Sequence, residues 1–138
     1  IQAVLGGIGA VSLFVAAIGI ANTMMMSIYE RTKEIGVLKV LGCALGDIRT
    51  MFLMEAGFIG FMGGVLGLGL SYSVSAAINK FLGASLSGMT GGSGAISRIP
   101  LWLSGSAVVF AVLIGMLAGL FPALRAMKLS PLAAIRNE

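Results

Sequence analysis

The residues able to support acid–base or nucleophilic chemistry are few in this sequence, and they are not arranged for catalysis. The 138 residues include no histidine and one cysteine, Cys43, which removes the Ser–His and Cys–His pairs that activate a nucleophile and most kinds of zinc site. Ser104 and Ser106 have no matching base. The phosphate-binding pattern G-x-x-x-x-G-K-[ST] does not occur in the sequence, so the chain has no such loop of its own. We therefore expect no catalytic residue, no metal ligand and no cofactor held by this chain.

The charged residues instead mark one short polar segment between two long apolar runs. From Glu30 to Gly42 the sequence reads ERTKEIGVLKVLG, and its five charged side chains are too costly to place in hydrocarbon, so the segment lies in water or among lipid headgroups. A stripe of small and polar residues recurs in it at helical spacing, formed by Thr32, Gly36, Lys39 and Cys43.

So short a helix is not stable alone, because most helical stability in proteins comes from burying a face. Two hypotheses follow for the segment Glu30 to Gly42. One is an amphipathic helix that lies on the membrane surface. The other is a coupling helix that docks into a groove on a separate soluble protein.

Composition places the rest of the chain in a membrane. With 58% hydrophobic and 10% charged residues, it departs far from soluble domains, in which about a quarter of residues are charged. Three apolar runs, at about 1–28, 51–78 and 101–124, exceed the roughly 20 residues that cross a bilayer as a helix. The net charge of +4 does not indicate nucleic-acid binding, because the basic residues are scattered outside these runs. The sequence predicts one domain over residues 1–138, an all-α integral membrane protein with three transmembrane helices and a short cytoplasmic coupling helix between the first and second.

The distribution of lysine and arginine predicts the orientation. Residues 29–50 hold four of them and residues 125–138 hold three, whereas the Gly- and Ser-rich segment 79–100 holds two. Because basic residues favour the cytoplasmic side, we expect a cytoplasmic coupling segment at 29–50, a cytoplasmic tail at 125–138 and a flexible extracytoplasmic loop at 79–100. The missing initiator methionine and the immediate apolar start predict that the chain is the C-terminal piece of a longer polypeptide.

Small residues spaced about four apart predict close helix packing inside the membrane. They are Gly60, Gly63, Gly64, Gly67 and Ser71 in the second run and Gly115 and Gly119 in the third. Such stripes let neighbouring backbones approach closely, so we expect them to hold together both the bundle and a dimer. Three methionines at 24–26 are interpreted as gap-filling residues of a packed interface, with a path for a hydrophobic substrate as the alternative.

Two charged residues lie near the predicted cytoplasmic boundary. Glu55 falls about one turn inside the second apolar run, where an unpaired carboxylate is costly. We predict that it pairs with Arg125, at the end of the third run. A carboxylate that reaches back to the interface is the alternative.

Three sequence blocks, in order, resemble the landmarks of a known family. ERTKEIGVLKVLG follows the first run, GDIRTMFLMEA opens the second, and FPALRAMKLSPLAAIRNE ends the chain. Together they are similar to the FtsX-like permease domain of ABC transporters, in particular its MacB-like branch, over nearly the whole chain. The matching residues of the first two blocks are Glu30, Arg31, Glu34, Ile35, Gly36, Leu41, Gly42 and Glu55. Those of the last block are Pro122, Ala123, Arg125, Ala126, Pro131 and Arg136.

The resemblance implies a permease subunit of the bacterial cytoplasmic membrane, here without its first span and without the large extracytoplasmic domain between the first two spans. Such permeases dimerise and bind two ATPase subunits or domains, which hold ATP and Mg²⁺. A periplasmic adaptor or membrane-fusion protein is a further expected partner. The implied function is to couple ATP hydrolysis in the partner to export or to motion transmitted through the membrane, so the permease is not itself an enzyme.

For the polar segment, the resemblance favours the coupling helix over the surface helix. On this view Ile35, Leu38 and Leu41 form part of the docking face, and Gly36 permits close approach of the partner's backbone. Glu30, Arg31 and Glu34 orient the helix by charge. Two alternative functions stay open: a cell-division-type FtsX regulator of cell-wall hydrolases, and a helical membrane scaffold without an ATPase.

Overall fold

The protein is a bundle of helices. A computed structural model describes the backbone of residues 2–90 and 98–128, and the side chains of these residues apart from 82–90. The helices are α1 (Gln2–Glu30), α2 (Thr32–Val40), α3 (Leu45–Thr90) and α4 (Leu101–Met127). Three of them, α1, α3 and α4, are long and apolar enough to cross a membrane. This confirms the predicted all-α class with three membrane-spanning helices and a short helix after the first.

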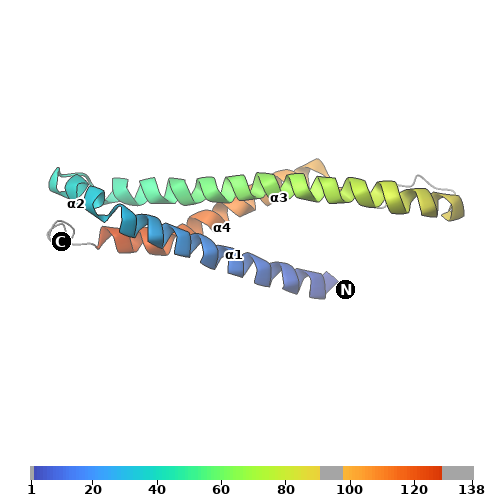
Figure 1. Cartoon of the computed structure of the whole chain (residues 1–138), viewed down its shortest axis with the longest axis horizontal. Helices are drawn as coiled ribbons and strands as arrows, with labels where there is room; N and C mark the ends of the chain where they lie inside the picture. The colour runs from blue at the N-terminus through green and yellow to red at the C-terminus, as the bar shows by residue number, and fades with distance from the viewer. Residues whose placement is uncertain (1, 91–97, 129–138) are drawn as a thin grey trace.

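The three long helices meet at the end of the molecule that carries α2. In Figure 1, α1 runs from the N-terminus toward this end, α3 leads away from it, and α4 returns so that its last turns lie near α2. The packing of α4 is most extensive against α3 and next against α1, whereas α1 and α3 touch little. Helix α2 and the last turns of α4 therefore share one end of the molecule.

Helix α3 is longer than the membrane span that the sequence predicts at about 51–78. The sequence predicted a loop from residue 79, but α3 continues as helix to Thr90 and is 46 residues long. Between these positions no proline interrupts the chain, and an isolated glycine weakens a helix by only about 1 kcal/mol relative to alanine. Of the rest of the predicted loop, residues 91–97 lie outside the described residues, and the extended Pro100 leads into α4.

Helix α2 ends at the glycine that the sequence predicted as its stop. Gly42 has a φ of +84°, a backbone conformation that glycine adopts without the steric cost of a Cβ. Its N–H donates to the carbonyl of Lys39 at 3.1 Å, and the N–H of Cys43 donates to the carbonyl of Leu38 at 3.0 Å. This pair of bonds is a Schellman termination. It turns the chain sharply, so that α3 begins at Leu45 directly beside the end of α2.

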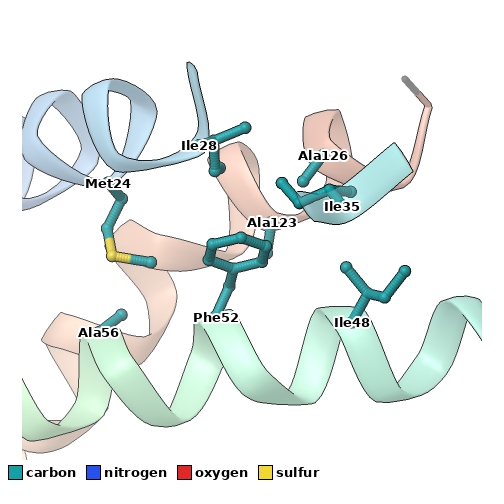
Figure 2. Close-up of a cluster of buried hydrophobic side chains, with 8 residues drawn as sticks. All are labelled: Met24, Ile28, Ile35, Ile48, Phe52, Ala56, Ala123 and Ala126. Atoms are coloured by element: carbon teal, nitrogen blue, oxygen red, sulfur yellow. The ribbon is translucent and has the colours of Figure 1, made fainter. Parts of the chain in front are cut away.

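A compact group of apolar side chains, which we term the junction cluster, joins all four helices at the α2 end (Figure 2). Its members are Met24 and Ile28 from α1, Ile35 from α2, Ile48, Phe52 and Ala56 from α3, and Ala123 and Ala126 from α4. Figure 2 shows the Phe52 ring between the side chains contributed by the other helices. Because these side chains are almost completely buried, the cluster is the packed centre around which the helices are arranged. Met24 fills space in it, as interpreted from the sequence.

Glycines set the distance between α3 and α4. A Cβ built on Gly60 would lie 2.5 Å from the carbonyl oxygen of Ala111, and one on Gly115 would lie 2.7 Å from that of Ala56. Gly64 and Gly119 also face the partner helix at close range. The two backbones therefore touch directly along this crossing, in the manner of small-residue contacts in membranes.

A second stripe of small residues predicted on α3 lies on an exposed face of the helix. Gly63, Gly67 and Ser71 are exposed, and no atom lies within 4 Å of a Cβ built on either glycine. This stripe does not pack the described helices of the chain against one another. It is separated from the Gly60 stripe because the helical repeat places positions three apart about 60° from one another.

Candidate functional site

The small, polar stripe of α2 faces the rest of the chain. Thr32 Oγ1 donates to the carbonyl of Ile28 at 2.9 Å, Gly36 is buried, and Cys43 packs against the junction cluster. The sequence predicts that Gly36 faces a partner protein, and this prediction is wrong. The structure places it inside, because so short a helix must bury a face and the nearest apolar surface belongs to the same chain.

Ile35 is likewise turned inward. Its exposed fraction is 1%, and Figure 2 shows it beside Ala126 of α4 and above Ile48 of α3. The prediction that Ile35 belongs to a docking face for another protein is therefore corrected: its partners are the chain's own helices. Leu38 is half-buried, which leaves Leu41 as the fully exposed member of the predicted trio.

Lys39 also lies on the inward side of α2, and its side chain caps the C-terminal end of α4. Its Nζ donates to the carbonyl of Ala126 at 3.1 Å and to that of Met127 at 2.8 Å. Carbonyls in the last turn of a helix have no partner within it, and the partial negative charge at this end attracts a cation. Burial lowers the pKa of Lys39 below the ordinary 10.5 by desolvating its ammonium group. This role of Lys39 is not predictable from the sequence, since nothing in residues 30–42 identifies a carbonyl 87 positions further on.

The apolar surface of α2 that the chain leaves uncovered lies on the opposite side. We call it the outward face; it consists of Val37 and Val40 of α2, Leu41 directly after α2 and Leu45 at the start of α3, which are 50, 65, 78 and 52% exposed. Glu30, Arg31 and Glu34 are exposed beside it. Since these charged residues keep the region out of hydrocarbon, an uncovered apolar surface here has the character of an interaction site.

The predicted pair of Glu55 and Arg125 is not formed. Glu55 is half-buried on α3, whereas Arg125 is exposed and lines a small hollow with residues of α1, namely Met25, Ile28 and Tyr29. In residues 2–81 and 98–128 no ion pair joins the two. The reason is rotational: α4 turns Ala123 and Ala126 toward the cluster, and Arg125 therefore projects toward α1.

Within the same described residues, His, Cys, Asp and Glu side chains do not gather in any group of three or more. The features that stand out at the α2 end are thus a half-buried cation, Lys39, bonded to the end of α4, and the outward face.

Comparison with known proteins gives a consistent result. The family model described as "FtsX-like permease C-terminal" matches residues 6–131. The chain is 38% identical to the ABC transporter permease YtrF of Bacillus subtilis (strain 168), over 95% of this chain and 31% of that protein. It is 39% identical to the uncharacterized ABC transporter permease MJ1507 of Methanocaldococcus jannaschii, over 96% of this chain and 32% of that protein.

A third relative has a longer chain. The macrolide export ATP-binding/permease protein MacB of Bdellovibrio bacteriovorus is 40% identical over 97% of this chain and 19% of its own length. The chain thus spans a third or less of the length of the curated relatives it matches.

Proposed function

Because this chain belongs to the FtsX-like permease family of ABC transporters, we propose that it couples ATP hydrolysis in a partner ATPase to export or to mechanical work across the bacterial cytoplasmic membrane. ATP and Mg²⁺ are bound by the partner, either a separate subunit or another domain of the same polypeptide. In this proposal the residues of this chain take no part in the hydrolysis itself. The observation that carries the proposal is the outward face, an uncovered apolar surface beside the membrane-spanning bundle.

The α2 end is the cytoplasmic end in this proposal. Seven of the nine lysines and arginines lie in residues 29–50 and 125–138, and basic residues favour the cytoplasm. The hydrogen bonds from Lys39 to the carbonyls of Ala126 and Met127 keep α2 and the end of α4 together. An ATPase in the cytoplasm therefore has access to α2.

The outward face is the surface that meets the ATPase. Val37, Val40 and Leu41 are three and four positions apart, which is the spacing of one helical face and the pattern by which an amphipathic helix lies in a groove. Leu45 follows the turn at Gly42. Interfaces of this kind owe most of their affinity to a few desolvated anchors, and Leu41, at 78% exposed, has the most apolar surface left to bury. Leu38 contributes at the edge, and the turn at Gly42 presents Leu41 at the tip.

The charges beside the face set the orientation of docking. Glu30, Arg31 and Glu34 are exposed, and charges at the rim of an interface contribute to specificity and to the rate of association more than to affinity. They remain in the proposed set of residues that meet the partner, whereas Ile35 and Gly36 leave it because those two are buried in the chain.

A second copy of the permease and an extracytoplasmic adaptor complete the proposed assembly. The exposed stripe of Gly63, Gly67 and Ser71 suits close approach of a second permease subunit in the bilayer. A periplasmic adaptor or membrane-fusion protein would engage parts of the polypeptide outside this chain.

The test is substitution of Leu41 in the full-length permease coexpressed with its ATPase. Leu41→Asp places a charge in the docking interface, and burying an unpaired charge is prohibitive, so the ATPase should no longer copurify and its stimulated activity should fall to the basal level. Leu41→Ala should weaken docking about tenfold, corresponding to the 1 to 2 kcal/mol typical of an interface anchor.

Leu41→Met is the matched control. It keeps a large apolar side chain at the same position and should retain the ATPase. If Leu41→Asp also retains copurification and stimulation, α2 is a membrane-surface helix and the proposal fails.

A further inference from the structure

The backbone links α2 directly to two of the three spans, α1 and α3, but not to α4. The backbone joins α1 to α2 at Arg31 and joins α2 to α3 through the turn at residues 41–44. Any displacement of α2 therefore reaches α1 and α3 through the chain itself. It reaches α4 directly only through non-covalent contacts across the α2–α4 junction.

The contacts available at that junction are of two kinds. Ile35 shares the junction cluster with Ala123 and Ala126 and lies beside Ala126 (Figure 2). Apolar contacts of this kind are non-directional, so they allow one helix to slide on another. The two hydrogen bonds from Lys39 Nζ to the carbonyls of Ala126 and Met127, at 3.1 and 2.8 Å, are directional and fix position along the helix axis.

The environment of Lys39 strengthens this link. Its side chain is half-buried, and hydrogen bonds to a charged donor are stronger where water is partly excluded. The acceptors are the carbonyls at the negative end of α4, so the bonds and the helix dipole act together. The side chain bonds the terminal turn itself, which means that moving Lys39 moves the end of α4.

We propose that Lys39 is a positioning residue that ties the docking helix α2 to the end of α4, so that α2 and α4 move as one body when the ATPase displaces α2. The proposal rests on the proposed function in that the ATPase supplies the displacement. Lys39 does not contact the ATPase. Its removal therefore leaves docking intact and lets α2 move without α4.

The first experiment measures the distance between α2 and α4 in the complete permease–ATPase complex. Spin labels are placed at Lys33→Cys and Leu124→Cys in a Cys43→Ala background, because both labelled side chains are exposed. With Lys39 present, the distance distribution should be narrow and unchanged by trapping the ATPase with ATP and vanadate. With Lys39→Met, it should broaden and shift by roughly 2 Å on trapping, the scale of helix shifts at interfaces.

Lys39→Arg is the conservative control, because its guanidinium also donates to carbonyls. It should keep the narrow distribution. The copurified amount of ATPase should be the same for all three proteins. If Lys39→Met keeps a narrow and unmoved distance, or if it loses the ATPase, Lys39 is not the tie. Failure of the proposed function looks different, since the ATPase would then not copurify with the unsubstituted permease.

A second experiment restores the link by other means. Lys39→Cys with Met127→Cys, again in the Cys43→Ala background, is joined by a short bismaleimide. Without the crosslinker, ATP turnover stimulated by the permease should fall about five- to tenfold, a coupling of ordinary size. Crosslinking should restore most of it. A role of Lys39 in local packing alone would not be restored by a tether, so an uncorrected loss after complete crosslinking overturns the proposal.

Discussion

Replacing Gly60 by alanine should destabilise the bundle, whereas the same replacement at Gly63 should not. The added methyl group at Gly60 would lie 2.5 Å from the carbonyl oxygen of Ala111 and 3.2 Å from the Cα of Val112. Both contacts are with backbone, which has no rotamer to change. At Gly63 nothing lies within 4 Å of the added group. The two variants therefore have the same chemistry and opposite surroundings.

The size of the destabilisation by Gly60→Ala follows from the overlap between the added methyl group and the carbonyl oxygen of Ala111. An ordinary contact begins at 3.4 Å, so α3 and α4 must separate by about 0.9 Å at Gly60, the difference between 3.4 and 2.5 Å. Overpacking of this kind costs about 1 to 3 kcal/mol. Both variants gain helix propensity of up to about 1 kcal/mol relative to glycine, so this gain cancels when they are compared. The two variants should therefore differ by the overpacking cost of about 1 to 3 kcal/mol, which is roughly five- to 160-fold in the folding equilibrium constant.

The assay is unfolding of the purified full-length permease in mixed micelles with increasing denaturing detergent, followed by loss of helical circular dichroism. Gly60→Ala should unfold at a lower detergent fraction than the unsubstituted protein, and Gly63→Ala at an equal or higher one. Equal destabilisation by both would refute the assigned faces of α3. Stabilisation by Gly60→Ala would show that α3 and α4 do not cross where the structure places them.

Three further outcomes are expected. Gly67→Leu, on the exposed stripe, should leave the unfolding of the subunit unchanged but reduce crosslinking between two copies of the permease; unchanged crosslinking would mean that this stripe faces lipid. Tyr72→Phe removes the 2.7 Å hydrogen bond to Ser104 between α3 and α4 and should cost about 0.6 kcal/mol, a typical value for such bonds in membranes, measured in the same unfolding assay against Tyr29→Phe. Competitive chemical labelling across a pH series should give Lys39 a pKa below 10.5, because burial disfavours its charged form. The pKa of Lys39 is then lower in the folded than in the unfolded protein. The desolvation cost to stability is therefore present below the folded pKa and disappears as the pH rises from there toward 10.5.

The location of α2 was accessible from sequence, but the face that it buries was not. Charged residues among apolar runs placed α2 outside hydrocarbon, and a Gly after a short helical pattern predicted its end at Gly42. The apolar residues of α2, however, surround the polar stripe on both sides. A pattern of that kind is compatible with burial of either face, so Ile35 and Gly36 were assigned to a partner that the structure replaces with α4.

The polar contacts of Lys39 and Arg125 could not be predicted from the sequence for a related reason. The cap from Lys39 depends on where the end of α4 lies, and Arg125 turns away from Glu55 because of how α4 is rotated about its axis. Charge and depth in the membrane restrict which residues can meet. They do not specify the rotation of one helix against another.

The sequence by itself determined the class of the protein, the three membrane-spanning helices, the short helix between the first two and the turn that ends it. These depend on hydropathy, length and local backbone chemistry, which are properties of contiguous residues. Only the tertiary structure decided which glycines touch, which face of α2 is buried and which cation caps α4. Those features depend on surfaces that are distant in the chain, and they are settled by the packing of Phe52 and its neighbours at the point where all four helices meet.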